Sequence, residues 1–366
     1  MSRIISLGTA VPQYGSRQNR ILEYMQGAYA DETASRKLKI LFHQSGIETR
    51  HSVVPDFGNE KTGTPLFKDN HYLPNVEERM NVYKEHAVPL AIAAIESALE
   101  KLDTSATDFG FTHLITVTCT GLYAPGIDAE IVERLGLPDD IFRTTVNFMG
   151  CNAAFHALKL GDIIVRAEPD AKVLIVCVEL CTIHFQPKNN HDNLLSNTIF
   201  GDGAAAAIIT SDSYGKDHHH CGLTINGFYS LLLNKGKDLM GWNITPVNFE
   251  MILDAKVPEF IGNEINNIVL KAGNKFNIQP DGINHWAIHP GGKKILDTVK
   301  KQMHLPDDGL QSSYNVLEEY GNMSSPTILF VLNEIGKALL QIDETIFAVG
   351  FGPGLSIETA LLTYEE

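Results

Sequence analysis

The chain has 366 residues, of which 44% are hydrophobic and 20% charged, and its formal net charge is −15. This length suits two fused domains of ordinary size, and this composition is typical of a globular protein. The acidic balance argues against a general nucleic-acid-binding or anionic-membrane-binding protein, because both classes need basic surface.

The N-terminus and the cysteines indicate the compartment. Residues 1–8 hold one basic residue and no long apolar core, unlike a signal peptide. No stretch approaches the about 20 apolar residues that span a bilayer. The five cysteines are odd in number and lie in or beside apolar stretches, which favours reduced thiols over a disulfide framework. We therefore expect a cytoplasmic protein that binds no membrane.

Apolar runs typical of strands alternate with helical patterns along the first half of the chain. The run at 171–180 shows no polar alternation, as expected in a sheet that is covered on both faces. The strands predicted in this half are 4–7, 112–119, 143–148, 171–180 and 201–211, and the helices are 87–102 and 153–166.

The second half repeats this order of elements. Residues 283–292 are predicted as a strand and turn whose pattern resembles that of 112–121. The other elements predicted here are helices at 259–276 and 324–340 and two strands within 344–364. The repeat predicts an α/β fold of two similar halves, residues 1–215 and 216–366, built around layered sheets.

A polar tract at 212–220 is expected to form the hinge or loop between the halves. It ends in His218, His219 and His220, which are potential metal ligands. A run of three histidines cannot aim all its rings at one ion in most conformations, so a solvated loop is the favoured interpretation. We predict no metal site in this protein.

Cys151 stands where a strand ends and a helix begins. It follows the predicted strand at 143–148 and lies two residues before the predicted helix at 153–166. Unpaired N–H groups and the helix dipole at such a position stabilise a thiolate. A catalytic nucleophile is one interpretation, and a buried structural cysteine is the alternative.

Two further polar residues lie at turns in the second half. His289 follows an apolar strand and precedes Pro290-Gly291-Gly292, and Asn322 follows Gly321 shortly before the last predicted helix. Both can face a cavity, although a histidine satisfied by backbone groups and an N-cap asparagine are the simpler interpretations. The glycine cluster at 350–356 offers backbone N–H groups to an oxyanion, and no Lys-Ser/Thr pair follows it as in a P-loop.

Taken together, these motifs resemble a known family. The blocks are Gly150-Cys151, "FGDGAAA" (200–206), "HPGG" (289–292), "YGNMSS" (320–325) and "GFGPGLSIET" (350–359). They are similar in sequence and spacing to the type III polyketide synthases, the chalcone synthase-like group of the thiolase superfamily. The resemblance covers nearly the whole chain and implies a thiolase-like fold with a layered αβαβα core.

The resemblance also implies a mechanism. Cys151 would take an acyl group from an acyl-CoA starter, and His289 and Asn322 would stabilise the enolate formed when malonyl-CoA loses CO₂. Repeated extension and cyclisation would give a pyrone, resorcinol or phloroglucinol-type product without a metal or redox cofactor. Phe200 and Phe249 match gatekeeping positions of the family, and the loop of Gly352, Pro353 and Gly354 would border the oxyanion site and cavity.

Further residues match the family's substrate-binding positions. Those expected to line the cavity are Cys119, Ala124, Cys181, His184, Ser196 and Ser324. Most are small, which favours an aliphatic starter, whereas His184 replaces a smaller hydroxyl residue. In the homodimer that the family implies, Ala124 would lie beside the partner's cavity. Those expected to bind coenzyme A are Lys37, Gly291, Gly292 and Lys293, although Ile40 and Gln44 replace basic residues of plant members.

Three other classes of protein remain open at this point. An initiating ketoacyl-acyl-carrier-protein synthase shares the Cys-His-Asn set and would perform a single condensation. A papain-like cysteine hydrolase has the same chain order of these residues but a different cysteine neighbourhood. A non-catalytic scaffold would keep the fold with an inert thiol.

Overall fold

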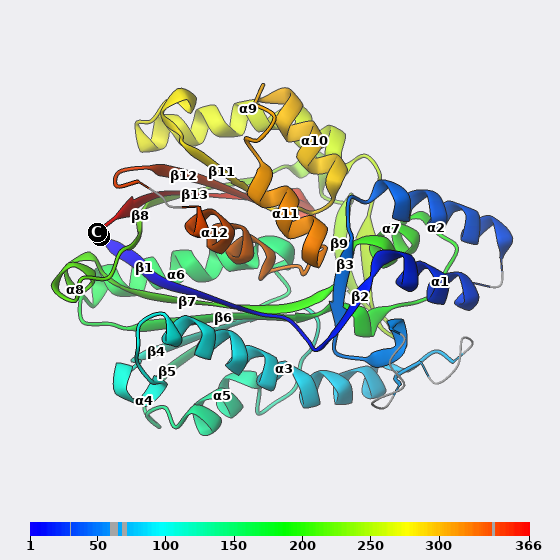
Figure 1. The fold of residues 1–366 in the computed structure, drawn as a ribbon, viewed down its shortest axis with the longest axis horizontal. Coiled ribbons are helices and arrows are strands. Elements are labelled where there is room, and N and C mark those ends of the chain that lie inside the picture. Colours follow the sequence, from blue (N-terminus) through cyan, green and yellow to red (C-terminus); the bar gives the residue numbers. More distant parts are fainter. Residues whose placement is uncertain (30, 59–64, 68–71, 339–340) are drawn as a thin grey trace.

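The computed structural model describes residues 1–29, 31–58, 65–67, 72–338 and 341–366. Within these residues, nine strands form one mixed sheet in the order β11-β12-β13-β8-β1-β7-β6-β4-β5 (Figure 1). The strands from the first half are β1 (Ser2–Ala10), β4 (His113–Thr118), β5 (Phe142–Asn147), β6 (Val173–Leu180) and β7 (Asp202–Ser211). Those from the second half are β8 (Gly222–Leu232), β11 (His285–Ile288), β12 (Thr345–Gly352) and β13 (Ser356–Glu365).

The two halves repeat one strand topology. In the first half β1 and β6 both run antiparallel to β7, and β4 runs parallel to β6. In the second half β8 and β12 both run antiparallel to β13, and β11 runs parallel to β12. The two sets join where β1 pairs with β8 over two residues. This repeat confirms the prediction of two similar α/β halves.

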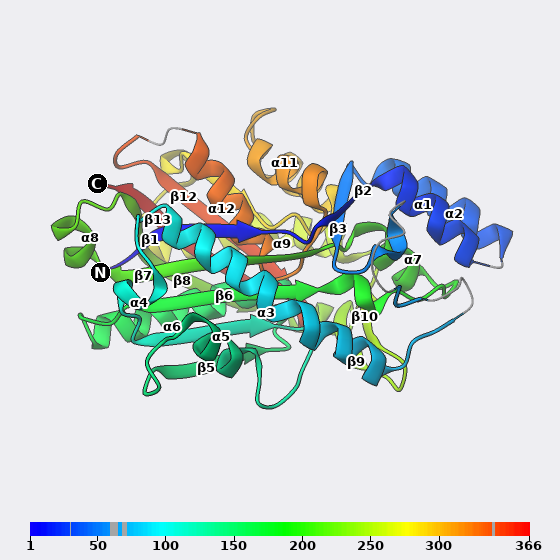
Figure 2. The same ribbon diagram turned by 60° about the horizontal axis from the view of Figure 1, so that its bottom comes forward.

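The single sheet consists of a first-half part and a second-half part, here called the two sheets of the core, and helices cover their outer faces and fill the space between them (Figures 1 and 2). Helices α9 (Val257–Phe276) and α10 (Lys293–Gln302) cover the second-half sheet, and α3 (Val76–Glu100) and α5 (Ile127–Leu135) cover the first. Between the sheets lie α6 (Ala153–Ala167) and α12 (Thr327–Lys337). Three buried hydrophobic clusters fill these interfaces, so the layering is the predicted αβαβα core.

Local sequence explains most elements. Every residue of β6 is buried, as its unbroken apolar run predicts. Helix α3 begins eleven residues before the predicted start at 87, because a capping box nucleates it. The Asn75 side chain accepts from the N–H of Glu78, and the Glu78 side chain accepts from the N–H of Asn75. Helix α12 begins at Thr327 rather than 324, which leaves residues 322–326 free to form a turn.

The polar tract at 212–220 is not wholly a loop, contrary to expectation. Its first part is a short helix, α8 (Asp212–Asp217), which the Ser211 hydroxyl caps by accepting from the N–H of Tyr214 at 3.3 Å. The His218 ring stacks on Tyr214 with a centroid distance of 4.0 Å. Among the described residues no group of three or more His, Cys, Asp or Glu side chains is arranged to hold a metal.

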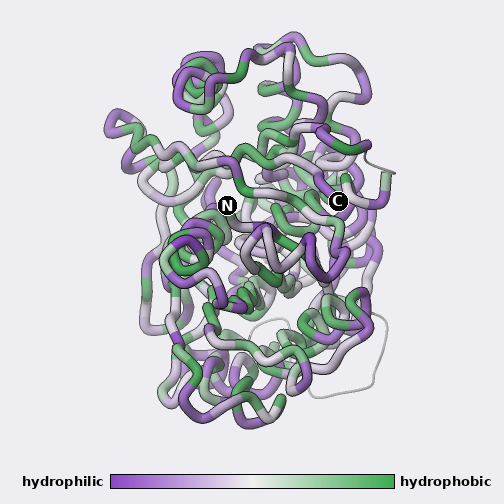
Figure 3. The backbone as a smooth tube through the Cα atoms, turned by 90° about the vertical axis from the view of Figure 1, so that its left-hand side faces the viewer, coloured by the Kyte–Doolittle hydropathy of each residue, from purple (hydrophilic) through white to green (hydrophobic). Residues whose placement is uncertain are grey.

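The chain ends lie on the same side of the molecule (Figures 2 and 3). Arg3 is fully buried there and pairs with Asp212 at 2.6 Å and Glu365 at 3.0 Å. Helices at the periphery carry both hydrophilic and hydrophobic residues (Figure 3), as expected of amphipathic helices. No helix in the described part of the chain is long and apolar enough to cross a membrane.

A lobe of smaller elements stands at one end of the layered core (Figures 1 and 2). It consists of β2 (Tyr14–Arg17), α1 (Gln18–Ala28), α2 (Glu32–Gln44), β3 (Thr49–Ser52), α7 (His191–Ile199), β9 (Met240–Ile244) and β10 (Phe249–Leu253). Strands β9 and β10 form an antiparallel hairpin, here called the β9–β10 hairpin. The site described next lies between this lobe and the ends of the core strands.

Candidate active site

Cys151 is presented by a tight turn between β5 and α6. Phe148 adopts φ +57° and Gly150 adopts φ +76° before a short 3₁₀ turn (Gly150–Asn152). A left-handed conformation is unusual for a bulky residue such as Phe148 and is characteristic of functional turns. A Cβ atom on Gly150 would lie 2.1 Å from Cδ of Pro353. The turn therefore requires glycine next to the nucleophile, and it packs directly on the glycine loop.

Burial dominates the electrostatics of Cys151. Cys151 is 5% exposed, and burial raises the pKa of its thiol to about 11. Hydrogen bonds with Ser324 and Asn322 lower this pKa, but by less than burial raises it. The expectation that the helix start stabilises a thiolate is therefore outweighed by desolvation. Cys151 is a neutral thiol at rest and needs a base to become a nucleophile.

Asn322 is aimed at the cysteine by its own backbone turn. Its Oδ1 accepts a hydrogen bond from the N–H of Ser324 at 2.8 Å, and its Nδ2 lies 4.0 Å from Sγ of Cys151. Ser324 adopts φ +62°, which closes this turn. The backbone of Asn322 also forms an isolated bridge with Phe200. The turn thus directs the amide of Asn322 toward the sulfur of Cys151, and the bridge places Phe200 beside Asn322.

His289 supplies an imidazole that has no hydrogen-bond partner among the described residues. It follows β11, its backbone N–H donates to the carbonyl of Val349 at 2.8 Å, and its side chain is 1% exposed. Burial lowers the pKa of the ring to about 3, so the imidazole is neutral. A buried, unpaired polar ring is rare in folded proteins and indicates a ligand or reactive partner.

Strand β12 links these groups. Its residue Val349 holds His289, and a Cβ atom on the next residue, Gly350, would lie 2.4 Å from the Phe155 ring and 3.3 Å from Cβ of Asn152. Both contacts belong to the turn and helix that carry Cys151. The structure thus places Asn322 next to Cys151 and connects His289 to the turn of Cys151 through β12.

A cavity of about 960 Å³, including its open mouth, lies beside Cys151. Of the residues predicted to line it, those that do are Cys119, Cys181, His184, Ser196, Ser324, Phe200, Phe249 and Pro353. Gly352 and Gly354 flank Pro353 without lining the cavity. Ala124 is exposed and does not line the cavity of its own chain, and its position beside a partner's cavity stays a prediction.

An apolar part of the cavity lining was not predicted. It includes five residues, namely Ile21, Met25, Val54, Phe57 and Phe185. They come from α1, the segment after β3 and the segment before α7, and each is buried in the core. No local pattern distinguishes them from ordinary core residues, so only their packing around the cavity reveals them.

A second pocket lies on the other side of α7. Ser196 and Asn197 face the cavity, whereas Leu195 and Thr198 face this second pocket. Three of the residues predicted to bind coenzyme A line it, namely Gly291, Gly292 and Lys293. Gln44 and Lys294, which were not among those predictions, line it as well. Lys293 also pairs with Asp297 at 2.8 Å. Lys37 is exposed on α2 and does not line this pocket. It lies seven residues before Gln44, which is about two helical turns, so the two residues share one face of α2.

Comparison with known proteins agrees with this geometry. The family model for chalcone and stilbene synthases, N-terminal domain, matches residues 1–213, and that for the C-terminal domain matches residues 229–364. Over 366 residues the chain is 31% identical to the alpha-pyrone synthesis polyketide synthase-like Pks18 of Mycobacterium tuberculosis, covering 98% of this chain and 90% of that protein. Over 367 residues it is 27% identical to the 3,5-dihydroxyphenylacetyl-CoA synthase of Streptomyces toyocaensis, covering 99% and 90%.

A solved structure is similar over the same extent. PKS-I from the brown alga Ectocarpus siliculosus superimposes with a TM-score of 0.92 at 30% identity, covering 99% of this chain and 98% of that one. These matches decide against the initiating ketoacyl synthases and the cysteine hydrolases. The chain therefore belongs to the chalcone and stilbene synthase family of type III polyketide synthases, acyltransferases that condense coenzyme A thioesters with loss of CO₂.

Proposed function

We propose that the protein loads an aliphatic acyl group from acyl-CoA onto Cys151, extends it iteratively with malonyl-CoA and cyclises the product. The proposal rests on two observations, an amide donor directed at a buried sulfur and a buried imidazole that lacks a partner in the described part of the chain and is connected through β12 to the turn that carries this sulfur. The Asn322 amide is directed at Sγ of Cys151, and the His289 ring is buried without a partner among the described residues. No metal or redox cofactor takes part in the proposed chemistry.

Loading begins with a proton transfer. The His289 ring accepts the Sγ proton of Cys151, since it is neutral and has a nitrogen lone pair free. The imidazolium and thiolate so formed would stabilise each other as an ion pair. The sulfur attacks the thioester carbonyl, and the backbone N–H of Cys151 stabilises the oxyanion beside the glycine loop at 352–354. Coenzyme A leaves as the thiol after taking the proton from the imidazolium.

Extension uses the same donors for a different charge. The malonyl thioester oxygen would lie between the His289 and Asn322 donors, which stabilise the enolate formed as CO₂ departs. Phe200 and Phe249 are 9% and 3% exposed and surround the malonyl group with apolar surface, which disfavours its carboxylate and favours neutral CO₂. The enolate carbon then attacks the acyl group on Cys151 and lengthens it by two carbons.

The shape of the cavity supports an aliphatic starter. Part of its lining is formed by apolar side chains, including Ile21, Met25 and Phe57. The guanidinium of the buried Arg50 in the same lining is engaged with backbone carbonyls and Gln18. The apolar part suits an alkyl chain, which gains free energy in proportion to the area it buries. An alkylpyrone, alkylresorcinol or phloroglucinol-type product would result, and the named alpha-pyrone synthesis of the mycobacterial relative supports the first of these.

The second pocket is proposed to bind the coenzyme A moiety. Lys293, Lys294 and Lys37 would supply positive charge to its phosphates against the acidic balance of the whole chain. Gly291 and Gly292 allow the pantetheine arm to approach the backbone closely. The first half, residues 1–215, would thus carry the nucleophile, and the second half, residues 216–366, the two donors.

The protein is further proposed to be a homodimer. Leu122, Phe142 and Met149 are 41%, 57% and 39% exposed, and Phe142 belongs to β5, the edge strand of the sheet. Exposed apolar side chains along an unpaired edge are typical of an interface. A monomeric mass in solution, measured by light scattering, would contradict this proposal.

The test of function is a product assay. Purified protein is incubated with ¹³C-labelled malonyl-CoA and, separately, short-chain, long-chain and aromatic acyl-CoA starters. Labelled products with several added two-carbon units are expected with an aliphatic starter and are absent from Cys151→Ala. The matched control is Cys221→Ala, which removes an exposed thiol and should leave the products unchanged. A product from the aromatic starter alone would contradict the proposed substrate class.

A further inference from the structure

His184 makes contacts that the predicted role in the cavity lining does not explain. It ends the 3₁₀ turn after β6, lines the cavity and is 7% exposed. Its Nδ1 accepts a hydrogen bond from the backbone N–H of Phe249 at 3.1 Å. Its Nε2 lies 2.7 Å from the carbonyl oxygen of Thr120 and donates to it. Both ring nitrogens are therefore engaged with backbone groups, which defines one neutral tautomer.

The Thr120 end of this bridge is firmly anchored. The buried carboxylate of Glu179 accepts from the N–H of Cys119 and from the hydroxyl of Thr120, both at 2.8 Å. The neighbouring carbonyl of Cys119 accepts from the indole N–H of Trp242 at 2.6 Å. Two successive carbonyls of this segment thus accept one hydrogen bond each. The carbonyl of Cys119 accepts from Trp242 of the β9–β10 hairpin, and that of Thr120 accepts from His184.

The Phe249 end carries the gatekeeping ring. The His184 and Phe249 rings stack with centroids 4.7 Å apart and an interplanar angle of 13°. The ring of Phe148, in the turn that presents the nucleophile, also contacts the Phe249 ring, with centroids 5.6 Å apart. The Asn248 side chain donates to the carbonyl of His184 at 3.3 Å. One histidine therefore holds both the backbone and the ring of Phe249.

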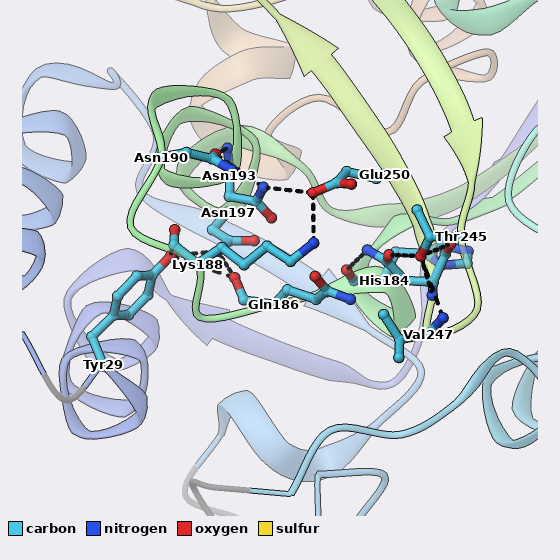
Figure 4. A network of polar contacts seen from close by, with 11 residues as sticks. Tyr29, His184, Gln186, Lys188, Asn190, Asn193, Asn197, Thr245, Val247 and Glu250 are labelled. Carbon is cyan, nitrogen blue, oxygen red and sulfur yellow. Dashed lines mark hydrogen bonds and ion pairs between the residues drawn. The ribbon is translucent and has the colours of Figure 1, made fainter.

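A separate tie holds the same strand further along. Lys188 pairs with Glu250 of β10 at 2.8 Å, and Asn193 donates to the same carboxylate at 3.2 Å (Figure 4). Glu250 follows Phe249, so its side chain lies on the opposite face of the strand. This tie holds the hairpin through Glu250, whereas the Phe249 ring is held by its neighbours: it stacks on His184 and has Phe148 and Trp242 at 5.6 and 6.4 Å between centroids. Of these three, only His184 also bonds the backbone N–H of Phe249.

We infer that His184 is the positioning residue of Phe249, a neutral bridge that fixes the gatekeeping ring against the segment 119–120. The inference rests on the proposed role of Phe249 in decarboxylation. Without the imidazole, the N–H of Phe249 and the carbonyl of Thr120 would both be buried without a partner. The end of the hairpin would then shift to regain hydrogen bonds, and the ring would leave the malonyl site.

The test compares two replacements of the ring. His184→Phe keeps an aromatic ring of similar size but removes both hydrogen bonds, whereas His184→Gln supplies one donor and one acceptor. We expect the kcat of malonyl-CoA decarboxylation to fall about tenfold in His184→Phe and to recover to within about threefold of wild type in His184→Gln. The matched control is His219→Phe, the same exchange at an exposed histidine, which should keep the wild-type rate.

A double-mutant cycle separates positioning from general damage. If His184 acts through Phe249, adding His184→Phe to Phe249→Leu lowers the rate no further. Multiplied losses would overturn the inference, and so would a wild-type rate for His184→Phe when Phe249→Leu is slow. An unchanged rate in Phe249→Leu would instead refute the proposed role of Phe249 and with it the catalytic consequence of the bridge.

Hydrogen exchange tests the bridge without any activity. We expect the backbone amide of Phe249 to exchange at least about tenfold faster in His184→Phe than in wild type, with protection regained in His184→Gln. Exchange at this amide that is the same in all three proteins would overturn the inference. This measurement also decides the case in which His184→Phe is too unstable to assay, because His184→Gln can then be compared directly with wild type.

Discussion

Gly150 and Pro353 are in such close contact that a Cβ atom on Gly150 would lie 2.1 Å from Cδ of the proline ring. The contact joins the turn that carries the nucleophile to the glycine loop of the other half. Neither side can yield easily, because Gly150 has φ +76° and the proline ring is rigid. The nucleophile turn and the glycine loop can therefore approach this closely only because residue 150 has no Cβ methyl group.

Gly150→Ala is expected to abolish acyl transfer. The added methyl must displace the glycine loop or the nucleophile turn, and a misplacement of about 1 Å can cost about a hundredfold in rate. Intact-mass measurement of the acyl-enzyme after addition of acyl-CoA checks the prediction. Gly336→Ala is the matched control, because a Cβ atom there meets nothing within 4 Å. Normal acylation of Gly150→Ala would show that the contact is not required.

Asn322→Asp is expected to lower malonyl-CoA decarboxylation by about a hundredfold or more. The exchange keeps the shape of the side chain but replaces the donor Nδ2 by an oxygen, so the enolate loses one stabilising hydrogen bond. Release of labelled CO₂ from malonyl-CoA measures the effect. Asn263→Asp, on the exposed face of α9, makes the same change and should have no effect. A similar loss in both variants would point to charge rather than to the donor.

Alkylation of Cys151 by iodoacetamide is expected to become faster with pH throughout the neutral and alkaline range. Burial raises the pKa of the thiol to about 11, so the reactive thiolate increases about tenfold per pH unit below that value. Peptide mass spectrometry after timed quenching follows the modification. A rate that reaches its plateau near pH 7 would instead indicate a thiolate already formed with His289.

The folded protein is expected to lose stability as the pH falls from 6.5 toward 3. Burial lowers the pKa of His184 to about 3, so between these values the unfolded chain binds a proton there that the folded chain does not. This difference amounts to about 2 kcal/mol at pH 5. Urea unfolding at pH 7 and pH 5 measures it. Between pH 7 and pH 5 the free energy of unfolding of His184→Gln should fall by about 2 kcal/mol less than that of wild type. An equal fall in both proteins would contradict the lowered pKa of His184.

Met25→Trp is expected to exclude the longest acyl-CoA starters and to leave the short ones as substrates. Met25 belongs to the apolar part of the cavity lining, and the larger indole would occupy space that a long alkyl chain needs. The kcat/KM for the longest accepted starter should fall at least about tenfold, while short starters should react as in wild type. Steady-state assays with saturated acyl-CoAs of increasing length decide. Equal losses at all lengths would indicate a general distortion of α1.

The sequence alone was sufficient wherever the signal is local. The repeat of strands and helices predicted the two similar halves, and the glycine-rich blocks around Cys151, His289 and Asn322 indicated the family. Both kinds of signal depend on the conformational needs of neighbouring residues, such as the glycine at position 150. The first three turns of α3 were missed because their charged surface hides the helical pattern, although the capping pair Asn75 and Glu78 was readable.

Tertiary structure decided the properties that depend on distant contacts. The helix start predicts a lowered pKa for Cys151, yet burial by groups from several elements raises it. Ile21, Met25 and Phe57 read as ordinary core residues, and only the packing of α1 against the rest of the lobe brings them to the cavity. From the sequence, His184 was expected only to line the cavity in place of a smaller hydroxyl residue. Its bonds to Thr120 and Phe249, 64 and 65 residues away, were decided by the fold, because no local pattern encodes which distant backbone groups will face a side chain.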